Sequence, residues 1–391
     1  SISPDGGWTW EQPVERAQGF VNSNAKIWGQ RLSDGSYATI YNPSEYRWPL
    51  GISLSKDGIE YTTLNLICGE VPPMRYGGNY KSYGPQYVRG IQEGNGNPAD
   101  QHMWVSYSMN KEDMWVARIP VPVRTTVQSH ADDDFATFRH LSDLIDWNIY
   151  SPVMAPVALK DGKLVLSDSD PFDYARVERK IPATKELKVS FDISAEQNDK
   201  GLLQIEFLDE KGTACSRIEL TADGQMRCKG GARYGKIINY EPRKSYHVEA
   251  VLSVSKRMIE VFIDGKKAGQ RMFFAPVAAI ERVMFRTGQQ RTFPTIDTEA
   301  DWYGILDHAG DTDALSSYSI AHFKTASMDS DAGAAILKYG DYKHYVDDFN
   351  AMEERRKKVF FLDTAWFLPR FPTVQLPPAG IRSALAATPG P

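Results

Sequence analysis

The sequence predicts an all-β protein with short strands in its first third, regular longer strands in its middle, and a tail of different character. Two observations support this fold class: a turn motif that occurs twice at blade spacing, and a strict alternation of apolar and polar residues in the middle of the chain. Aromatic residues make up 12% of the chain and suit the pleated surfaces of sheets. With 391 residues, the chain is long enough for two or three domains.

The repeated motif first occurs as SPDGGWTW (residues 3–10), in the order S-x-D-x-G-x-T-W. A second version, SKDGIEY, runs from Ser55 to Tyr61. Ser and Asp side chains hydrogen-bond to the backbone of such turns, and glycine permits a positive φ. We expect the aromatic residue to fill the space between strands. Ser3 and Ser55 are 52 positions apart, which matches one four-stranded blade of a β-propeller.

Residues 1–128 are therefore predicted to form about two propeller blades. The last strand pair joins MWVSYS to MWVARI through a polar turn at residues 110–113, and Pro120 and Pro122 end the sheet. We expect this turn to be solvated, with a polar contact to a ligand as the alternative. A propeller needs about four blades or more to close. We therefore expect a C-terminal part of a longer protein, with the missing blades on another chain or a lost upstream segment.

The alternation within residues 129–330 predicts an antiparallel β-sandwich, or jelly roll. ELKVSFDI (186–193) alternates strictly, and LLQIEF (202–207) and RMIEVFI (257–263) repeat the pattern. The last segment is followed by Asp264 and Gly265, a common hairpin sequence.

Residues 331–391 form a tail of different composition. Aromatic and Met side chains recur there at helical spacing, which predicts a short amphipathic helix carrying Tyr342, Tyr345, Phe349 and Met352. The remainder is rich in Pro and Ala without a period, which is typical of a linker or an irregular strap.

Composition excludes several classes of partner. The formal net charge is -5 and no Lys/Arg run is interleaved with aromatics, so we expect no nucleic acid. No run approaches the roughly 20 apolar residues of a membrane span. Cys68, Cys215 and Cys228 suit free buried thiols, with a Cys215–Cys228 pair as the alternative. We expect no cofactor, unless structural calcium binds acidic residues 132–134 or 168–173.

The S-x-D-x-G-x-T-W turn resembles the Asp-box of sialidase-like β-propellers. YVRGIQEGNGNP and MWVSYSMNKEDMWVARIPVPV carry the same likeness, and the x-V-x-I-D-G-K order in the sandwich resembles concanavalin-like and laminin-G-like domains. The resemblance implies the C-terminal blades of a bacterial glycan-active protein that is secreted, periplasmic or at the cell surface. Its implied ligand is a poly- or oligosaccharide.

The candidate site is MRYGGNYKSYGPQYVRGIQEGNG (residues 74–96), where Tyr and Arg are set between glycines. The resemblance implies that arginine binds a sugar carboxylate and that a tyrosine is the nucleophile. A lyase for uronic acids would use Arg to neutralise the carboxylate and Tyr as base or acid. Both reactions therefore need an Arg beside a Tyr.

We assign Tyr87 and Arg89 as catalytic, because residues two apart on a strand point to one face. Arg89 lies mid-strand in an apolar run, so we expect its charge to have a partner. The predicted substrate-binding residues are Arg75, Tyr76, Tyr80, Tyr83 and His102. In the alternative interpretation, these Tyr and Arg side chains stack between blades and His102 satisfies a turn.

Three functions are compatible with these patterns. The first is an enzyme, a glycoside hydrolase or polysaccharide lyase that cleaves next to a sialic or uronic acid. The second is a non-catalytic carbohydrate-binding module that uses the sandwich, with the propeller as scaffold. Exposed aromatics on a sandwich face would favour it, and the candidates are Tyr234, Tyr240, Trp302 and Tyr303. The third is a propeller that serves as a docking platform.

Overall fold

The computed structural model describes residues 3–12, 22, 25–44, 47–76, 82–91, 101–124, 127–288, 312–328 and 374–375. Within these ranges every regular element is a β-strand, apart from two 3-10 turns, η1 (Phe135–Thr137) and η2 (Leu141–Asp143). The predicted all-β fold class is confirmed. No helix of the described ranges is long and apolar enough to cross a membrane. The predicted tail helix lies outside the described residues.

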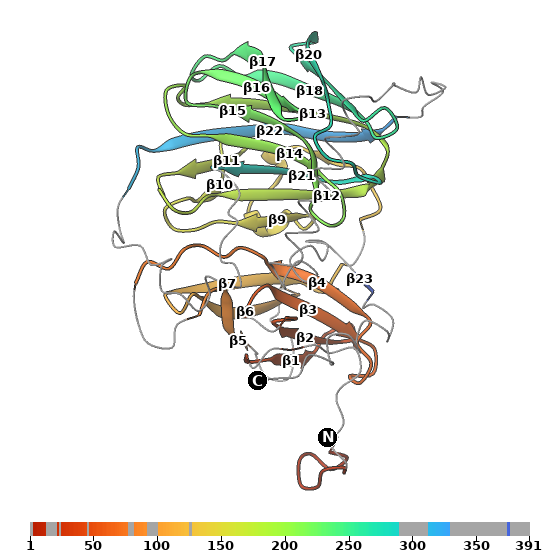
Figure 1. Ribbon diagram of the computed structural model, residues 1–391. Coiled ribbons are helices and arrows are strands. Elements are labelled where there is room, and N and C mark those ends of the chain that lie inside the picture. The colour runs from red at the N-terminus through yellow and green to blue at the C-terminus, as the bar shows by residue number, and fades with distance from the viewer. Residues whose placement is uncertain are drawn as a thin grey trace.

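Two antiparallel meanders make up the N-terminal part (Figure 1). The first has the order β1 (Trp28–Arg31), β2 (Tyr37–Tyr41), β3 (Leu50–Ser55) and β4 (Thr63–Cys68), and β23 (Val374–Gln375) pairs with β4. The second has the order β5 (Pro85–Ile91), β6 (His102–Met109) and β7 (Asp113–Pro120). Both contribute to one apolar core. That they are propeller blades, and that a domain ends at residue 128, stay predictions.

The first turn motif has the predicted hydrogen bonds. Ser3 Oγ accepts a hydrogen bond from the Gly7 N–H at 2.6 Å, and Asp5 accepts one from the Thr9 N–H at 2.8 Å. The bonds from the Thr9 hydroxyl and N–H lower the pKa of Asp5 to about 2. Gly7 has φ of 100°. Trp10, however, is 58% exposed, so the expectation that it fills the space between strands is not met within the described residues.

The second turn motif repeats these bonds and adds the predicted aromatic contact. Ser55 Oγ accepts from the Gly58 N–H at 2.9 Å, and Gly58 has φ of 80°. Asp57 accepts hydrogen bonds from the N–H groups of Glu60 and Ile59, which lower its pKa. The Tyr61 hydroxyl lies 2.8 Å from the Thr39 hydroxyl of β2. Here the aromatic residue does bridge strands.

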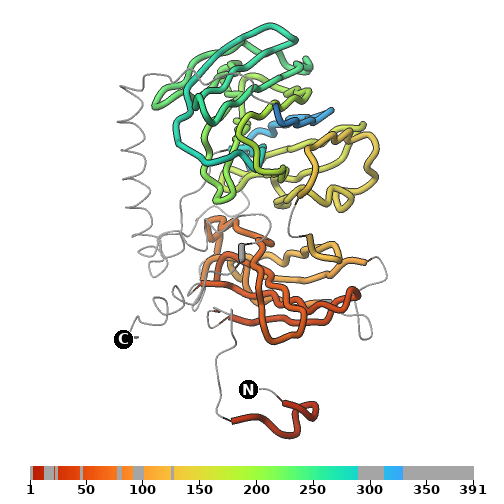
Figure 2. The backbone as a smooth tube through the Cα atoms, turned by 90° about the vertical axis from the view of Figure 1, so that its right-hand side faces the viewer, coloured from red at the N-terminus to blue at the C-terminus, as the bar shows by residue number. Residues whose placement is uncertain are grey.

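The larger C-terminal part is the predicted two-sheet sandwich (Figures 1 and 2). One sheet has the order β10 (Val157–Lys160), β11 (Lys163–Asp168), β22 (Ser316–Ser327), β13 (Glu186–Ala195), β18 (Tyr246–Ser253), β19 (Met258–Ile263) and β20 (Lys266–Met272), with β8 (Asp132–Asp133) also paired to β22. The other has the order β17 (Arg233–Asn239), β16 (Gln225–Gly230), β15 (Ala214–Leu220), β14 (Leu203–Leu208), β21 (Ile280–Thr287), β12 (Arg176–Thr184) and β9 (Trp147–Tyr150).

The alternating residues face the space between the two sheets, as predicted. Phe191 of β13, Phe207 of β14 and Val261 of β19 are all at most 1% exposed and belong to one core cluster. Burial of such side chains contributes about 1.5–3 kcal/mol each. The sandwich is therefore stabilised mainly by apolar contact between its sheets, and its likeness to concanavalin-like domains stays a prediction.

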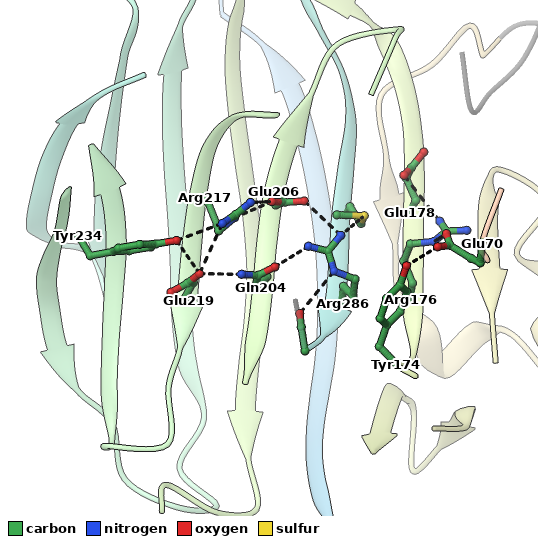
Figure 3. Close-up of polar contacts among 12 residues, drawn as sticks. Glu70, Tyr174, Arg176, Glu178, Gln204, Glu206, Arg217, Glu219, Tyr234 and Arg286 are labelled. Carbon is green, nitrogen blue, oxygen red and sulfur yellow. Dashed lines mark hydrogen bonds and ion pairs between the residues drawn. The ribbon is translucent and has the colours of Figure 1, made fainter. Parts of the chain in front are cut away.

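A buried polar contact joins the N-terminal sheets to the sandwich (Figure 3). Glu70 follows β4, and its carboxylate accepts a hydrogen bond from Arg176 Nε of β12 at 2.7 Å. It also accepts one from the Tyr174 hydroxyl. Glu70 and Arg176 are each 2% exposed. Nearby, the rings of Trp115 (β7) and Tyr150 (β9) stack with centroids 4.9 Å apart.

The carboxylates of the two acidic clusters bind protein groups. Asp133 accepts hydrogen bonds from the side chains of Arg179 and Trp147, and Asp170 accepts from two backbone N–H groups. Within the described part of the chain, no cluster of three or more His, Cys, Asp or Glu could hold a metal ion. Structural calcium stays a prediction. The three cysteines are buried and free, as expected.

We expect Glu70→Gln to lower the free energy of unfolding by about 3 kcal/mol, because it leaves the buried Arg176 guanidinium without its full counter-charge. Urea unfolding at neutral pH measures the change. Glu249→Gln is the matched control, because the Lys188–Glu249 pair is partly exposed and should contribute at most about 1 kcal/mol. Equal effects of the two substitutions would contradict the role given to Glu70.

Candidate functional site

Tyr87 lies at an irregular point of β5. The register pairs Gln86 with Ser108 and Arg89 with Ser106, so one extra residue forms a β-bulge between them. Tyr87 has φ of 58°, in the left-handed region that non-glycine residues rarely adopt. Such a conformation costs about 1 kcal/mol or more and persists where the surroundings enforce it. The side chain is 39% exposed.

Three cations from separate segments surround the Tyr87 ring. The Arg47 guanidinium carbon lies 5.3 Å from the ring centroid, Lys111 Nζ lies 5.5 Å away and Lys26 Nζ lies 5.6 Å away. These distances are within the range of cation–π attraction. We refer to Tyr87, Lys26, Arg47 and Lys111 as the Tyr87 cluster.

The cations change the acidity of the phenol. A hydrogen bond from Arg47 lowers the pKa of Tyr87, burial opposes this effect, and Lys111 adds to the lowering. Hydrogen bonds and positive charges favour the phenolate. The Tyr87 cluster is therefore suited to hold negative charge, either on the phenol itself or on a bound ligand.

A buried glutamine orients Arg47. Gln86 is fully buried, and its Oε1 accepts a hydrogen bond from Arg47 Nη1 at 3.0 Å. Its Nε2 donates to the Ser82 carbonyl at 2.6 Å. Because the amide is held at both ends, the guanidinium is directed toward the Tyr87 ring before any ligand arrives.

Gly84 and Asn110 hold the two chain segments that carry Tyr87 and Lys111. Asn110 Oδ1 accepts a hydrogen bond from the Gly84 N–H at 2.7 Å, and the Asn110 N–H donates to the Gly84 carbonyl at 3.0 Å. Gly84 has φ of 93°, and a Cβ there would lie 2.6 Å from the Arg47 carbonyl oxygen. Only glycine allows this approach. The β6–β7 turn is thus anchored to the segment before β5.

Arg89 and His102 lie on the same sheet as Tyr87 but differ in position. Arg89 is exposed on β5, so water solvates its charge and the mid-strand partner expected from sequence is not required. His102 begins β6, five residues before Tyr107. Since a strand rises about 3.4 Å per residue, His102 lies roughly 17 Å along the sheet from the bulge. The fold does not bring it beside Tyr87.

Arg75 and Tyr76 lie beside the acidic end of the β6–β7 turn. Arg75 forms ion pairs with Asp113 and Glu112. The Glu112 carboxylate also accepts hydrogen bonds from the N–H groups of Arg75 and Tyr76, at 2.9 Å in each case. Its side chain is 3% exposed. The turn expected to be solvated is thus partly buried, and the charge of Arg75 is already neutralised.

An acidic cavity of about 370 Å³ lies beside Arg75. Its lining includes Glu112 and Asp113 from the turn and Asp170 and Asp173 from the sandwich. These carboxylates would repel a sugar acid. A carboxylate clamp by Arg75 is therefore less favourable than one by the Tyr87 cluster.

The remaining predicted aromatic residues divide by exposure. Tyr83 is 5% exposed, and burial raises its pKa, so it packs in the protein and has little surface for a sugar. Tyr240 is 2% exposed and donates to a carbonyl. Tyr234 is 37% exposed on β17. Tyr80, Trp302 and Tyr303 lie outside the described residues.

Lys26 and Arg47 are not among the site residues predicted from the sequence, and Lys111 is predicted only as part of a turn. No sequence signal identifies the first two, because each is a lone cation in an irregular segment far from residue 87. Their convergence follows from the packing of two separate sheets against each other. The β1–β5 contact and the bulge bring together segments that are distant in sequence.

Comparison with known proteins gives one family model and a group of solved structures. Residues 147–302 match the model of the sialidase-like, CBM domain. The chain is similar to a solved sialidase. The two share 66% sequence identity with a TM-score of 0.81 over 90% of this chain, which spans 32% of the length of that sialidase.

More distant similarities cover about half of the chain. Bacillus licheniformis beta-glucanase matches at 10% identity over 52% of this chain and 100% of its own, with a TM-score of 0.36. Alginate lyase AlgAT5 from polysaccharide lyase family 7 matches at 13% identity over 47% of this chain and 95% of its own, with a TM-score of 0.33. The comparison with curated proteins found no match.

We expect Arg47→Gln to raise the pKa of Tyr87 toward the ordinary tyrosine value of about 10, because it removes the strongest interaction that favours the phenolate. NMR titration of isotope-labelled tyrosine rings measures this pKa, and the signal missing from the Tyr87→Phe variant identifies the Tyr87 ring. Arg31→Gln is the matched control, since Arg31 lies over the ring of Tyr37 instead. A Tyr87 pKa that does not rise would contradict the assigned contact.

Proposed function

We propose that this chain belongs to a glycan-active, sialidase-like protein and that it binds an acidic sugar at the Tyr87 cluster. The observation that carries the proposal is the convergence of three cations on one exposed tyrosine ring. A sugar carboxylate would accept charge-assisted hydrogen bonds from Arg47 and Lys111. The phenol would contact the sugar ring or a hydroxyl group.

The similarity to a sialidase supports a glycan as the ligand, and the match of residues 147–302 to a sialidase-like, CBM domain supports a carbohydrate-binding role for the sandwich. The net charge of -5 argues that binding of an anion depends on local cations, because the chain as a whole does not attract anions. Secretion or a surface location would place the chain among extracellular glycans and is part of the proposal.

A second candidate function is cleavage at the same site. The lowered pKa and the left-handed backbone of Tyr87 favour it, because catalytic groups combine shifted pKa values with enforced geometry. As a nucleophile, the phenolate oxygen would bond to the anomeric carbon while the glycosidic oxygen departs. As a base, it would take the C5 proton of a uronic acid, the C4–C5 double bond would form, and the C4–O bond to the leaving sugar would break. Arg47 would stabilise the developing negative charge.

We expect the wild-type chain to bind sialyllactose or trigalacturonate more tightly than lactose, in calorimetric titrations that weaken with added salt. Lys111→Met should weaken binding roughly tenfold, the effect of losing one charge-assisted hydrogen bond. Lys188→Met on the sandwich is the matched control and should change nothing. Equal affinity for lactose and the acidic sugars would contradict the proposal.

Cleavage is tested with Tyr87→Phe, which keeps the ring and removes the hydroxyl. If the tyrosine is a nucleophile or base, turnover should fall at least about 100-fold while affinity changes little. Released reducing ends without ultraviolet absorbance indicate hydrolysis, and an unsaturated product that absorbs indicates a lyase. Turnover equal to that of the wild type would exclude Tyr87 as a catalytic residue.

A further inference from the structure

The seven-stranded sheet carries two rows of side chains on the face turned away from the sandwich core. Each row runs from strand to strand through directly opposed residues. The first contains Glu178, Met284, Glu206, Arg217, Lys229 and Tyr234. The second contains Arg176, Arg286, Gln204, Glu219, Arg227 and Lys236. Figure 3 shows the polar contacts of this region in two groups, one that runs from Arg286 to Tyr234 and one around Arg176 and Glu70.

The two ends of these rows differ in exposure. Toward β12, Arg176, Glu178 and Arg286 are at most 2% exposed. Arg176 forms an ion pair with Glu178, and Arg286 forms one with Glu206. Toward the edge strand β17, Tyr234 is 37% exposed and the Arg227 side chain is 35% exposed. The rows therefore lead from a closed interior to an edge that solvent reaches.

Hydrogen bonds hold Tyr234 in place at that edge. Its hydroxyl donates to Glu219 Oε1 at 2.9 Å and accepts from Arg217 Nη1 at 3.1 Å. The Arg227 guanidinium lies 4.5 Å from the ring centroid, and Lys229 Nζ lies 5.9 Å from it. A ring fixed in this way loses little conformational entropy when a ligand binds.

Positive charge exceeds negative charge in this region. In the part of the chain that the structure describes, Arg217, Arg227 and Arg286 all form their ion pairs with the same two carboxylates, those of Glu206 and Glu219. Among the described residues Lys229 makes cation–π contacts, the shorter of them to Phe274 at 4.4 Å, but no ion pair. Half-buried cations without a full set of counter-charges attract an anion strongly.

We infer that the β15–β17 edge of the seven-stranded sheet is a second acidic-sugar site, with Arg227 and Lys229 binding the sugar carboxylate and Tyr234 contacting the sugar ring. We call it the Tyr234 site. Arg217 acts as a positioning residue, because it fixes the Tyr234 hydroxyl and has a carboxylate partner in Glu206. This site is separate from the Tyr87 cluster and lies on the sandwich.

Two sites for the same chemical group on one chain have a consequence for affinity. A polymer that carries several sugar acids can occupy both sites if its length spans them, and the second binding step is then intramolecular. A short ligand with a single acidic sugar gains nothing from the second site. The inference therefore predicts a preference for long acidic polysaccharides over short ones.

The test is an NMR titration of the full chain with labelled tyrosine rings, in which the Tyr234 and Tyr87 signals report the two sites separately. Sialyllactose and trigalacturonate supply the carboxylate from two kinds of sugar, and lactose is the neutral control. Either acidic ligand should shift the Tyr234 signal to saturation. Arg227→Gln should raise the Kd read at Tyr234 about tenfold and leave the Kd read at Tyr87 unchanged.

Lys229→Met is the second variant and should have the same effect, and Lys188→Met on the other sheet is the control that should have none. The inference is overturned if neither acidic ligand moves the Tyr234 signal, if lactose moves it equally, or if both variants bind like the wild type. If the acidic ligands shift the Tyr234 signal but not the Tyr87 signal, the proposed function is refuted and this inference stands. If they shift the Tyr87 signal but not the Tyr234 signal, only the inference is refuted.

Discussion

The buried ion pair between Glu70 and Arg176 is the contact on which the arrangement of the two β-parts depends. Either charge alone in this interior would cost several kcal/mol, so the end of β4 and the outer face of β12 must meet in one register. The stacked rings of Trp115 and Tyr150 add apolar area beside the pair and restrict rotation about it. The N-terminal sheets and the sandwich are therefore joined by a buried polar contact and by an aromatic one.

Charge compensation explains which parts of the protein can bind a ligand. In the interior, Arg176 faces the carboxylates of Glu70 and Glu178, and nothing remains for a ligand to neutralise. At Tyr87 and Tyr234, cations gather around a tyrosine ring that is more than a third exposed. The same elements thus produce structural contacts where the charges balance and candidate sugar sites where they do not.

Sequence patterns predicted the strands and turns well because these depend on local chemistry. The strand at residues 186–193 could be predicted from the period of its apolar residues alone. The Ser55 turn could be predicted from the hydrogen bonds that Ser and Asp side chains make to the backbone. The Gly and Arg residues near Tyr87 in the sequence pointed to it, but its cations were not predicted, because Arg47 and Lys26 approach it only where two separate sheets pack together. The pairing of Arg75 with Glu112 likewise could not be predicted from the sequence, because the two residues are 37 positions apart.

The most direct test of the central claim is a crystal structure of this chain with bound sialyllactose or trigalacturonate. We predict a sugar carboxylate oxygen about 3 Å from the Arg47 guanidinium or the Lys111 ammonium group, with the sugar against the Tyr87 ring. A bound acidic sugar whose carboxylate contacts neither cation, with the Tyr87 ring left in solvent, would contradict it.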